Sequence, residues 1–143
     1  MFERLVTLGS EVNPATLPGL VDRALSLAIA RSNGEIVGVG GMKRPYDTHR
    51  RDVFEQAQVA SDAESYIYEL GWVYVCESVR GQRLSSRIVE ALLQVVSSGK
   101  VYATSAIDKE RMHSALSREG FTRLGLPYPS KQNKTPIQLF VCK

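Results

Sequence analysis

The stretch from Tyr66 to Lys100, YIYELGWVYVCESVRGQRLSSRIVEALLQVVSSGK, decides the fold. Its first part, Tyr66 to Cys76, is rich in aromatic and β-branched residues and apolar on both faces, which is typical of a central strand covered from both sides. Its second part repeats apolar residues at helical spacing. We therefore expect a buried strand, a short basic turn, and an amphipathic helix that begins near Gln82 and ends at Ser97-Ser98-Gly99. The strand's two apolar faces hold Leu70, Trp72, Tyr74 and Cys76 on one side and Val73 and Val75 on the other, and the helix stripe holds Leu84, Ile88, Ala91, Leu92, Val95 and Val96.

The turn between strand and helix, Glu77 to Arg83, is polar and basic. The first turn of a helix carries unpaired backbone N–H groups and roughly +0.5 of an elementary charge. A glycine at position 81 lets a ligand approach the backbone, and Arg80 and Arg83 add full positive charges. Two interpretations follow from the turn alone: a cradle for phosphate or pyrophosphate, or an ordinary strand-to-helix connection with solvated arginines.

The whole stretch resembles the acyl-CoA-binding core of the GNAT superfamily of N-acetyltransferases, in which a central strand enters a Gln/Arg-x-x-Gly-x-Gly/Ala turn. Here the six positions read Arg80-Gly81-Gln82-Arg83-Leu84-Ser85. Arg80 matches, whereas Arg83 replaces the first motif glycine and Ser85 the second small residue. The resemblance implies a mixed α/β sheet flanked by helices, one domain over residues 1–143, and acetyl-CoA as cosubstrate without a metal. The cofactor-binding residues that it implies are Val73, Tyr74, Val75, Arg80, Gly81, Gln82, Arg83, Leu84, Ser85 and Ser86.

The same resemblance implies how the cosubstrate's arm is held. In GNAT proteins two neighbouring parallel strands splay apart, and the freed backbone N–H groups bind the pantetheine arm and the thioester carbonyl. The corresponding segments here are 72–75 and 102–105. Val73 and Val75 are then the expected backbone donors.

Length and composition set wider bounds. A chain of 143 residues with 43% hydrophobic and 23% charged residues is typical of one soluble globular domain. The net charge of +3 suits anionic ligands such as CoA and does not by itself indicate nucleic acid. No apolar run approaches about 20 residues and no signal peptide opens the chain, so we expect a cytoplasmic protein without membrane contact, as a monomer or homodimer. Cys76 and Cys142 should be reduced, and no His/Cys/carboxylate cluster has metal-ligand spacing.

The rest of the chain predicts further elements. The Asn33-Gly34 pair between two apolar runs indicates a β-hairpin. Glycines 38, 40 and 41 make its second strand slim, so that a helix or loop can pack closely over it. Residues 2–8 fit a short strand or a helical turn, and we favour the strand. The other expected elements are a helix starting at Asn13-Pro14, hairpin strands at 26–31 and 35–43, a helix at 49–59, a strand at 101–107, a helix at 109–118 that ends at Glu119-Gly120-Phe121 into a strand, a loop at 126–136 and a strand at 137–142.

Acetyl transfer requires a group that accepts the amine's proton, and Glu69 is the candidate catalytic base. It is the one carboxylate inside the central strand, where apolar neighbours would partly desolvate it. The alternative is a structural glutamate paired with an arginine. The tyrosine that serves GNAT enzymes as general acid corresponds to Leu116, so that role is unassigned, with Tyr74 and Tyr128 left open. His113 is expected to be structural.

The acceptor should be bounded by the hairpin and by segments 44–65 and 125–136, whose charges are mixed and form no continuous basic track. This favours a small-molecule amine or a protein amino group over nucleic acid. Segment 44–65 could instead be a surface helix with a solvated basic end. Two other function classes stay open: an inactive CoA-binding homologue, and a nucleic-acid-binding or -modifying protein, suggested by Lys43-Arg44 and the run His49-Arg50-Arg51.

Overall fold

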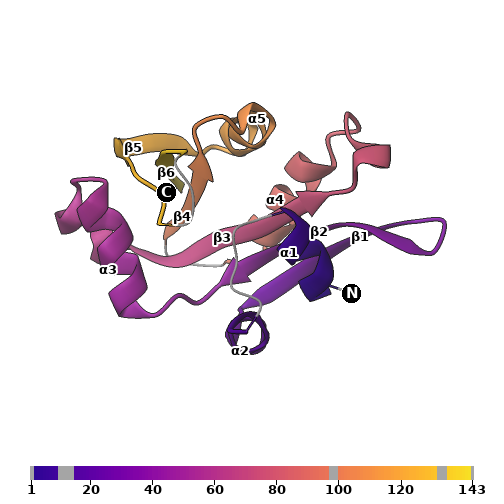
Figure 1. Ribbon diagram of the computed structural model, residues 1–143, viewed down its shortest axis with the longest axis horizontal. Coiled ribbons are helices and arrows are strands. Elements are labelled where there is room, and N and C mark those ends of the chain that lie inside the picture. The colour runs from indigo at the N-terminus through magenta and orange to yellow at the C-terminus, as the bar shows by residue number, and fades with distance from the viewer. Residues whose placement is uncertain (1, 10–14, 97–99, 132–134, 143) are drawn as a thin grey trace. The chain divides into compact units, whose positions relative to one another are not determined.

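The computed structural model describes residues 2–9, 15–96, 100–131 and 135–142. It has the expected mixed α/β architecture, with helices around a six-stranded sheet of order β1-β2-β3-β4-β6-β5 (Figure 1). The elements are α1 (Phe2–Gly9), α2 (Leu17–Arg23), β1 (Ser26–Ser32), β2 (Glu35–Lys43), α3 (Asp47–Gln56), η1 (Ala60–Ser65), β3 (Tyr66–Val75), η2 (Glu77–Val79), α4 (Leu84–Leu93), β4 (Lys100–Ala106), α5 (Glu110–Arg118), β5 (Thr122–Tyr128) and β6 (Ile137–Cys142). None of the helices in these described ranges has the length and apolar character needed to cross a bilayer.

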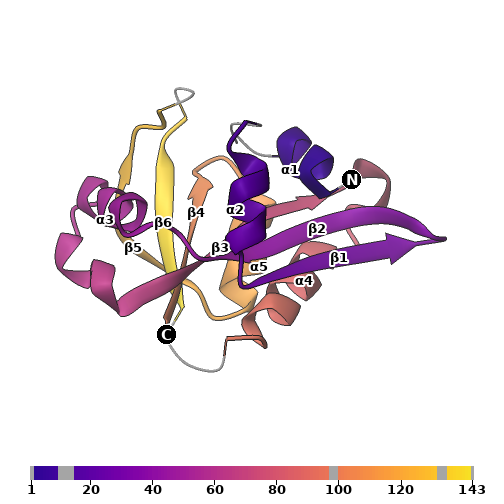
Figure 2. The same cartoon turned by 90° about the horizontal axis from the view of Figure 1, so that it is seen from below.

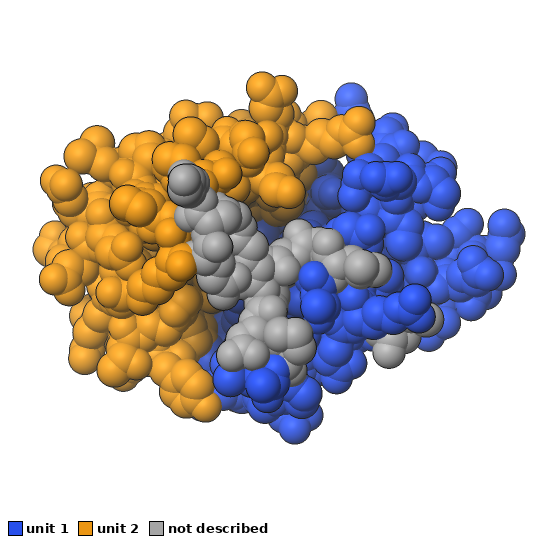
Figure 3. Space-filling view, viewed as in Figure 1, with its two compact units in different colours: residues 1–44, 70–97 blue, residues 45–69, 98–143 orange. Residues whose placement is uncertain are grey.

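The chain divides into two compact units, which Figure 3 colours separately. The first unit comprises residues 1–44 and 70–97, and the second comprises residues 45–69 and 98–143. The central strand β3 contributes to both, with residues 66–69 in the second unit and residues 70–75 in the first. Each unit is described by itself below.

The first unit contains the predicted hairpin. Strands β1 and β2 pair antiparallel, and their register shifts by a bulge between Ala30 and Arg31. Asn33 and Gly34 both adopt left-handed backbone conformations, with φ of 51° and 80°. Two consecutive left-handed residues are what a tight type I′ hairpin turn requires, which is why Asn-Gly predicts it.

The slim second strand of this hairpin receives α4 on one face, as expected. A Cβ atom added at Gly40 would lie 2.5 Å from Ile88 Cγ2 and 3.1 Å from Leu92 Cδ1 of α4. Gly38 faces the same helix. The opposite face packs against α1 and α2 in a buried cluster, and Figure 1 shows α2 and α4 on opposite sides of these strands. The cluster consists of Phe2, Leu5, Val6, Leu17, Val39 and Trp72.

Replacing Gly40 by alanine tests this close approach. We expect Gly40→Ala to lower the free energy of unfolding by about 1–3 kcal/mol, because the added methyl group overpacks the contact with Ile88. Urea denaturation measures the change. The matched control is Gly19→Ala in α2, where an added Cβ would meet nothing within 4 Å. Equal stability of the Gly40 and Gly19 variants would contradict the packing described here.

The second unit contains the strands β4, β5 and β6, the first residues of β3, and the helices α3 and α5. Strand β6 pairs antiparallel with β4 on one side and with β5 on the other, as Figure 2 shows. α3 packs against these strands through the side chains of Val53, Phe54 and Ala57. The buried cluster consists of Val53, Phe54, Ala57, Ala63, Tyr66, Tyr102, Tyr128, Leu139 and Val141.

Two predicted elements differ in kind or length. The first segment is the helix α1 and not a strand, because its buried residues Phe2, Leu5 and Val6 follow helical and not alternating spacing. The helix α4 begins at Leu84, two residues after the predicted start, and ends at Leu93. Its apolar stripe therefore ends at Leu92, and Val95 is exposed to solvent.

Other boundaries shift by a few residues. The predicted helix at 49–59 is α3 at Asp47–Gln56, and it cannot continue through Gln58, whose φ of 63° is left-handed. Strand β5 extends to Tyr128, so the following loop is shorter than predicted. The predicted helix start at Asn13-Pro14 and the predicted helix end at Ser97-Ser98-Gly99 lie outside the described residues.

Candidate functional site

The basic turn of the first unit has a backbone that normally requires glycine. Gly81 has a φ of 91°, and Arg83, directly before α4, has a φ of 58°. A left-handed conformation costs a residue with a side chain roughly 1–2 kcal/mol. Arg83 thus adopts a glycine-type backbone at the position where the GNAT motif has its first glycine.

The N-terminus of α4 faces this turn. Arg83 is its N-cap and makes no side-chain capping hydrogen bond. The first backbone N–H groups of a helix have no partner within the helix. Together with the helix dipole, such groups favour an anionic ligand. The binding role of Leu84, Ser85 and Ser86 at this end of α4 stays a prediction.

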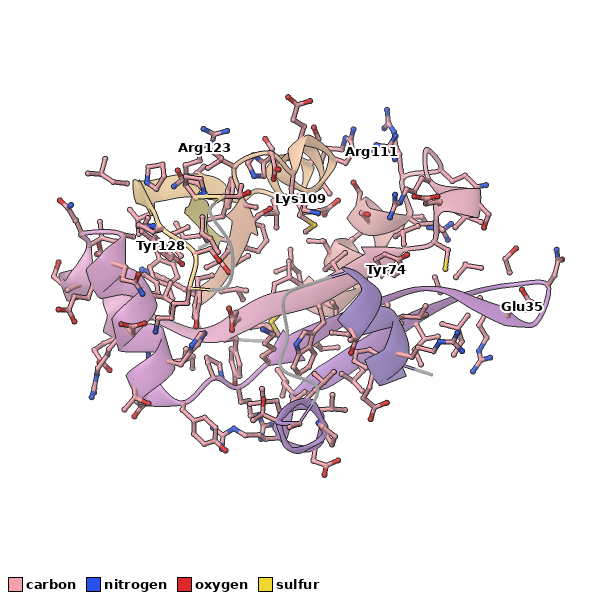
Figure 4. The ribbon with its side chains drawn as sticks, viewed as in Figure 1. Glu35, Tyr74, Lys109, Arg111, Arg123 and Tyr128 are labelled. Atoms are coloured by element: carbon pink, nitrogen blue, oxygen red, sulfur yellow. The ribbon has the colours of Figure 1, made fainter. Side chains whose placement is uncertain are left out.

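Arg80 contacts the end of β3 as well as the basic turn, which the sequence did not predict. Its Nε donates a 3.0 Å hydrogen bond to the backbone oxygen of Val75, at the end of β3. Its Nη1 lies 3.5 Å from Glu77 Oε1, and its guanidinium carbon lies 5.7 Å from the ring centroid of Tyr74, which Figure 4 labels. The Arg80 side chain is 37% exposed, so part of the guanidinium remains open to a ligand. Arg80 therefore ties the turn to the end of the strand.

The central strand has an irregular residue just before the expected backbone donors. Trp72 takes a left-handed φ of 58° within β3. A left-handed residue interrupts the regular pleat of a strand, as in a bulge, and leaves neighbouring backbone groups out of the ladder. Val73 follows directly, and Val75 lies two residues further on. Their role as donors, and the splay of 72–75 from 102–105, stay predictions.

In the second unit, the candidate base Glu69 lies beside a histidine that sequence spacing did not connect with it. Glu69 is in β3, and its side chain is only 5% exposed. His49 is in α3, with a side chain that is 53% exposed. His49 Nε2 lies 3.6 Å from Glu69 Oε1. A buried carboxylate is thus in contact with an imidazole that reaches solvent.

Two tyrosine hydroxyls interact with the same carboxylate. Burial, followed by the negative charge of Glu69, raises the pKa of Tyr102 in β4 far above its ordinary value. The same two causes raise the pKa of Tyr128 in β5, which projects toward α3 in Figure 4. The hydroxyl of Tyr102 is buried and has no hydrogen-bond partner among the described residues. Both tyrosines therefore stay protonated, so that their hydroxyls are available as hydrogen-bond donors and not as bases.

Ion pairs hold α3 in place. Arg50 is buried, and its guanidinium lies 3.2 Å from both Asp47 and Glu64. Arg51 donates a 2.9 Å hydrogen bond to Glu64, which holds the pKa of that carboxyl below its usual value. Within the basic run of α3, Arg50 is therefore buried and paired, whereas Arg51 is paired but 59% exposed.

A further ion pair joins α3 to the segment after β5. Lys131 Nζ lies 3.0 Å from Asp52 Oδ2, and this hydrogen bond is the main cause that lowers the pKa of Asp52. The backbone N–H of Leu126 also donates a 3.0 Å hydrogen bond to the oxygen of Ala57. Segments 44–65 and 125–136, which the sequence assigned to the acceptor side, are therefore in contact.

Other predicted residues have structural surroundings. His113 Nε2 lies 2.9 Å from the backbone oxygen of Ala106, and its ring packs on Phe140 with centroids 4.9 Å apart. Leu116, at the position of the GNAT tyrosine, is fully buried. Cys76 and Cys142 are free thiols. Within the described residues, no group of three or more His, Cys, Asp or Glu side chains could hold a metal ion.

The sequence of the chain matches the model of a known protein family. The model of the Acetyltransferase (GNAT) family matches residues 8–121. No curated protein matches the chain.

Solved structures with the same fold share little sequence with the chain. A GNAT family acetyltransferase from Elizabethkingia anophelis, crystallised with acetyl-CoA bound, matches with a TM-score of 0.68 at 13% identity, over 98% of this chain and 88% of that one. An IAA acetyltransferase from Bacillus cereus ATCC 14579 matches with a TM-score of 0.70 at 10% identity, over 99% and 91%. An acyl-CoA N-acyltransferase from Pseudomonas aeruginosa matches with a TM-score of 0.62 at 16% identity, over 99% and 87%. At these identities the likeness shows the fold.

Proposed function

Because the chain belongs to the GNAT acetyltransferase family, we propose that it transfers an acetyl group from acetyl-CoA to a primary amine. The observation that carries this proposal is the turn between β3 and α4. Its two left-handed residues, Gly81 and Arg83, lead into the N-terminus of α4. The Arg83 side chain makes no capping hydrogen bond there. The acetyl-CoA bound in the structural neighbour from Elizabethkingia anophelis supports the choice of cosubstrate.

The pyrophosphate of acetyl-CoA would bind at this turn. The backbone N–H groups of residues 84–86 would donate to its oxygens, and the open part of the Arg80 guanidinium would supply a charge-assisted contact. Arg83 would stand beside the anion as a second cation. The N–H groups of Val73 and Val75, which follow the left-handed residue Trp72 in β3, would hold the pantetheine arm.

Truncating Arg80 tests this placement. We expect Arg80→Ala to weaken acetyl-CoA binding, measured by calorimetry, by about 1–3 kcal/mol, since a charge-assisted hydrogen bond is lost. Arg80→Ala also removes the ion pair with Glu77, so a control must separate the loss of this pair from the loss of the cation. Glu77→Gln removes the ion pair with Arg80 and keeps the cation. Unchanged affinity in Arg80→Ala, or an equal loss in both variants, would refute the contact with pyrophosphate.

The chemistry would use Glu69 as the base. The amine must lose a proton before its nitrogen can attack the thioester carbon, and the C–S bond then breaks to release the CoA thiolate. A carboxylate with 5% exposure is surrounded by protein and not by water, which favours its acceptance of a proton from a bound amine. The unpartnered hydroxyl of Tyr102 and the hydroxyl of Tyr128 would donate hydrogen bonds beside it.

The acceptor would be a small-molecule amine or a protein amino group. The segments assigned to the acceptor side carry paired charges: Arg50 and Arg51 with Glu64, and Lys131 with Asp52. Paired arginines are poorly available to the phosphates of a nucleic acid, whose binding depends on free cations. The paired charges therefore support a small-molecule or protein amine as the acceptor over a nucleic acid.

One observation favours a second candidate, a CoA-binding protein without transferase activity. The position of the GNAT general-acid tyrosine is the fully buried Leu116, which cannot protonate a thiolate. Release of free thiol from acetyl-CoA in the presence of a panel of amines distinguishes the two candidates. Binding of acetyl-CoA without amine-dependent thiol release would favour the inactive homologue.

A further inference from the structure

The burial of Glu69 raises the question of how its proton leaves, given the function proposed above. A protonated amine and acetyl-CoA yield an amide, CoA thiol and one proton. The nitrogen forms a bond to the thioester carbon and gives up two protons, the C–S bond breaks, and the sulfur takes one proton. The other proton must reach solvent in every turnover. The Glu69 side chain, 5% exposed, has almost no contact with water of its own.

We infer that His49 relays this proton from the Glu69 carboxyl to solvent. Its Nε2 lies 3.6 Å from Glu69 Oε1, and more than half of its side chain is exposed. The distance is longer than a hydrogen bond, so a small rotation of the imidazole completes the path. The neighbouring Arg50 is paired with Asp47 and Glu64, and the pair with Glu64 ties α3 to the segment directly before β3.

The other ionisable groups near Glu69 and His49 are less suited to carrying the proton. Tyr102 and Tyr128 face Glu69 from β4 and β5, and their raised pKa values keep them protonated. Arg50 is permanently charged. Asp52, on the same helix as His49, stays ionised because the hydrogen bond from Lys131 lowers its pKa, so it does not take up the proton. Histidine is the side chain that readily gains and loses a proton near neutral pH.

Removing the imidazole and then supplying it in solution tests the relay. We expect His49→Ala to lower kcat by about tenfold or more, since proton transfer by a positioned group commonly contributes 10²–10⁴. Added imidazole should restore most of the loss, and a series of substituted imidazoles should restore it according to their basicity. The affinity for acetyl-CoA should not change. The control is His113→Ala, whose ring contacts the Ala106 oxygen and Phe140 and should not respond to imidazole.

The outcomes separate the relay from the function on which it rests. A wild-type rate in His49→Ala, or a loss that imidazole does not restore, overturns the relay while acetyl transfer by the wild-type protein still stands. A wild-type protein that acetylates no amine overturns both. Because His49 is exposed, thermal unfolding of the alanine variant should match that of the wild-type protein; a marked fall in Tm would mean that the side chain is structural and would count against the relay.

Discussion

We expect Glu69→Gln to lower the turnover of acetyl transfer by roughly 10²–10⁴ at neutral pH, because the amide keeps the shape of the side chain and cannot accept the amine's proton. The affinity for acetyl-CoA should change little, since the residue would act on the acceptor and not on the cosubstrate. The loss should shrink as pH rises, because the free amine then becomes abundant without a base. Steady-state kinetics across a pH series, together with calorimetry, measure both quantities.

The control for this variant is Glu55→Gln, an exposed carboxylate on α3. It removes the same charge from the same unit and should leave turnover unchanged. If Glu69→Gln retained a rate near that of the wild-type protein at every pH, Glu69 would be a structural residue and another group would have to act as the base.

The second large effect should be on stability. Phe54 is fully buried in α3, stacks on Tyr66 at 5.7 Å between ring centroids, and meets Tyr102 edge-on at 5.2 Å. We expect Phe54→Ala to lower the free energy of unfolding by about 3–5 kcal/mol, since it removes the ring and leaves a cavity. The midpoint of urea denaturation should fall accordingly.

The matched variant Phe54→Leu fills most of this space and should cost about 1.5 kcal/mol or less. The comparison also bears on the site, because Tyr102 rests on the Phe54 ring and interacts with Glu69. A loss below 1 kcal/mol in Phe54→Ala would mean that this aromatic cluster is not the core of the second unit.

Local patterns in the sequence predicted most of the fold. Asn33-Gly34 predicted a hairpin turn because both residues tolerate the left-handed backbone that the turn requires. The glycines at 38 and 40 predicted the close approach of a helix, and α4 packs there. The wrong assignment at Phe2–Gly9 arose because a short apolar segment fits strand and helix alike, and tertiary contacts of Phe2, Leu5 and Val6 decide between them.

The candidate site was predictable only in part. The basic turn could be found because its residues are consecutive, although the left-handed conformation of Arg83 could not be read from an arginine. Glu69 stood out as a carboxylate in an apolar strand. Its neighbours His49 and Tyr102 are distant in sequence, and no spacing connects them with it. His49 and Tyr102 come near Glu69 only when α3 and β4 pack beside the first residues of β3 within the second unit.

The central claim is that the protein moves an acetyl group from acetyl-CoA to an amine. The most direct test incubates the wild-type protein with acetyl-CoA and, in parallel, small amines, peptides and nucleic acids at several salt concentrations, and follows both products by mass spectrometry. We predict an N-acetylated small amine or peptide, formed in equal amount with free CoA and only weakly dependent on salt. Release of CoA without any acetylated acceptor, or transfer to nucleic acid alone with a steep loss as salt rises, would contradict the account.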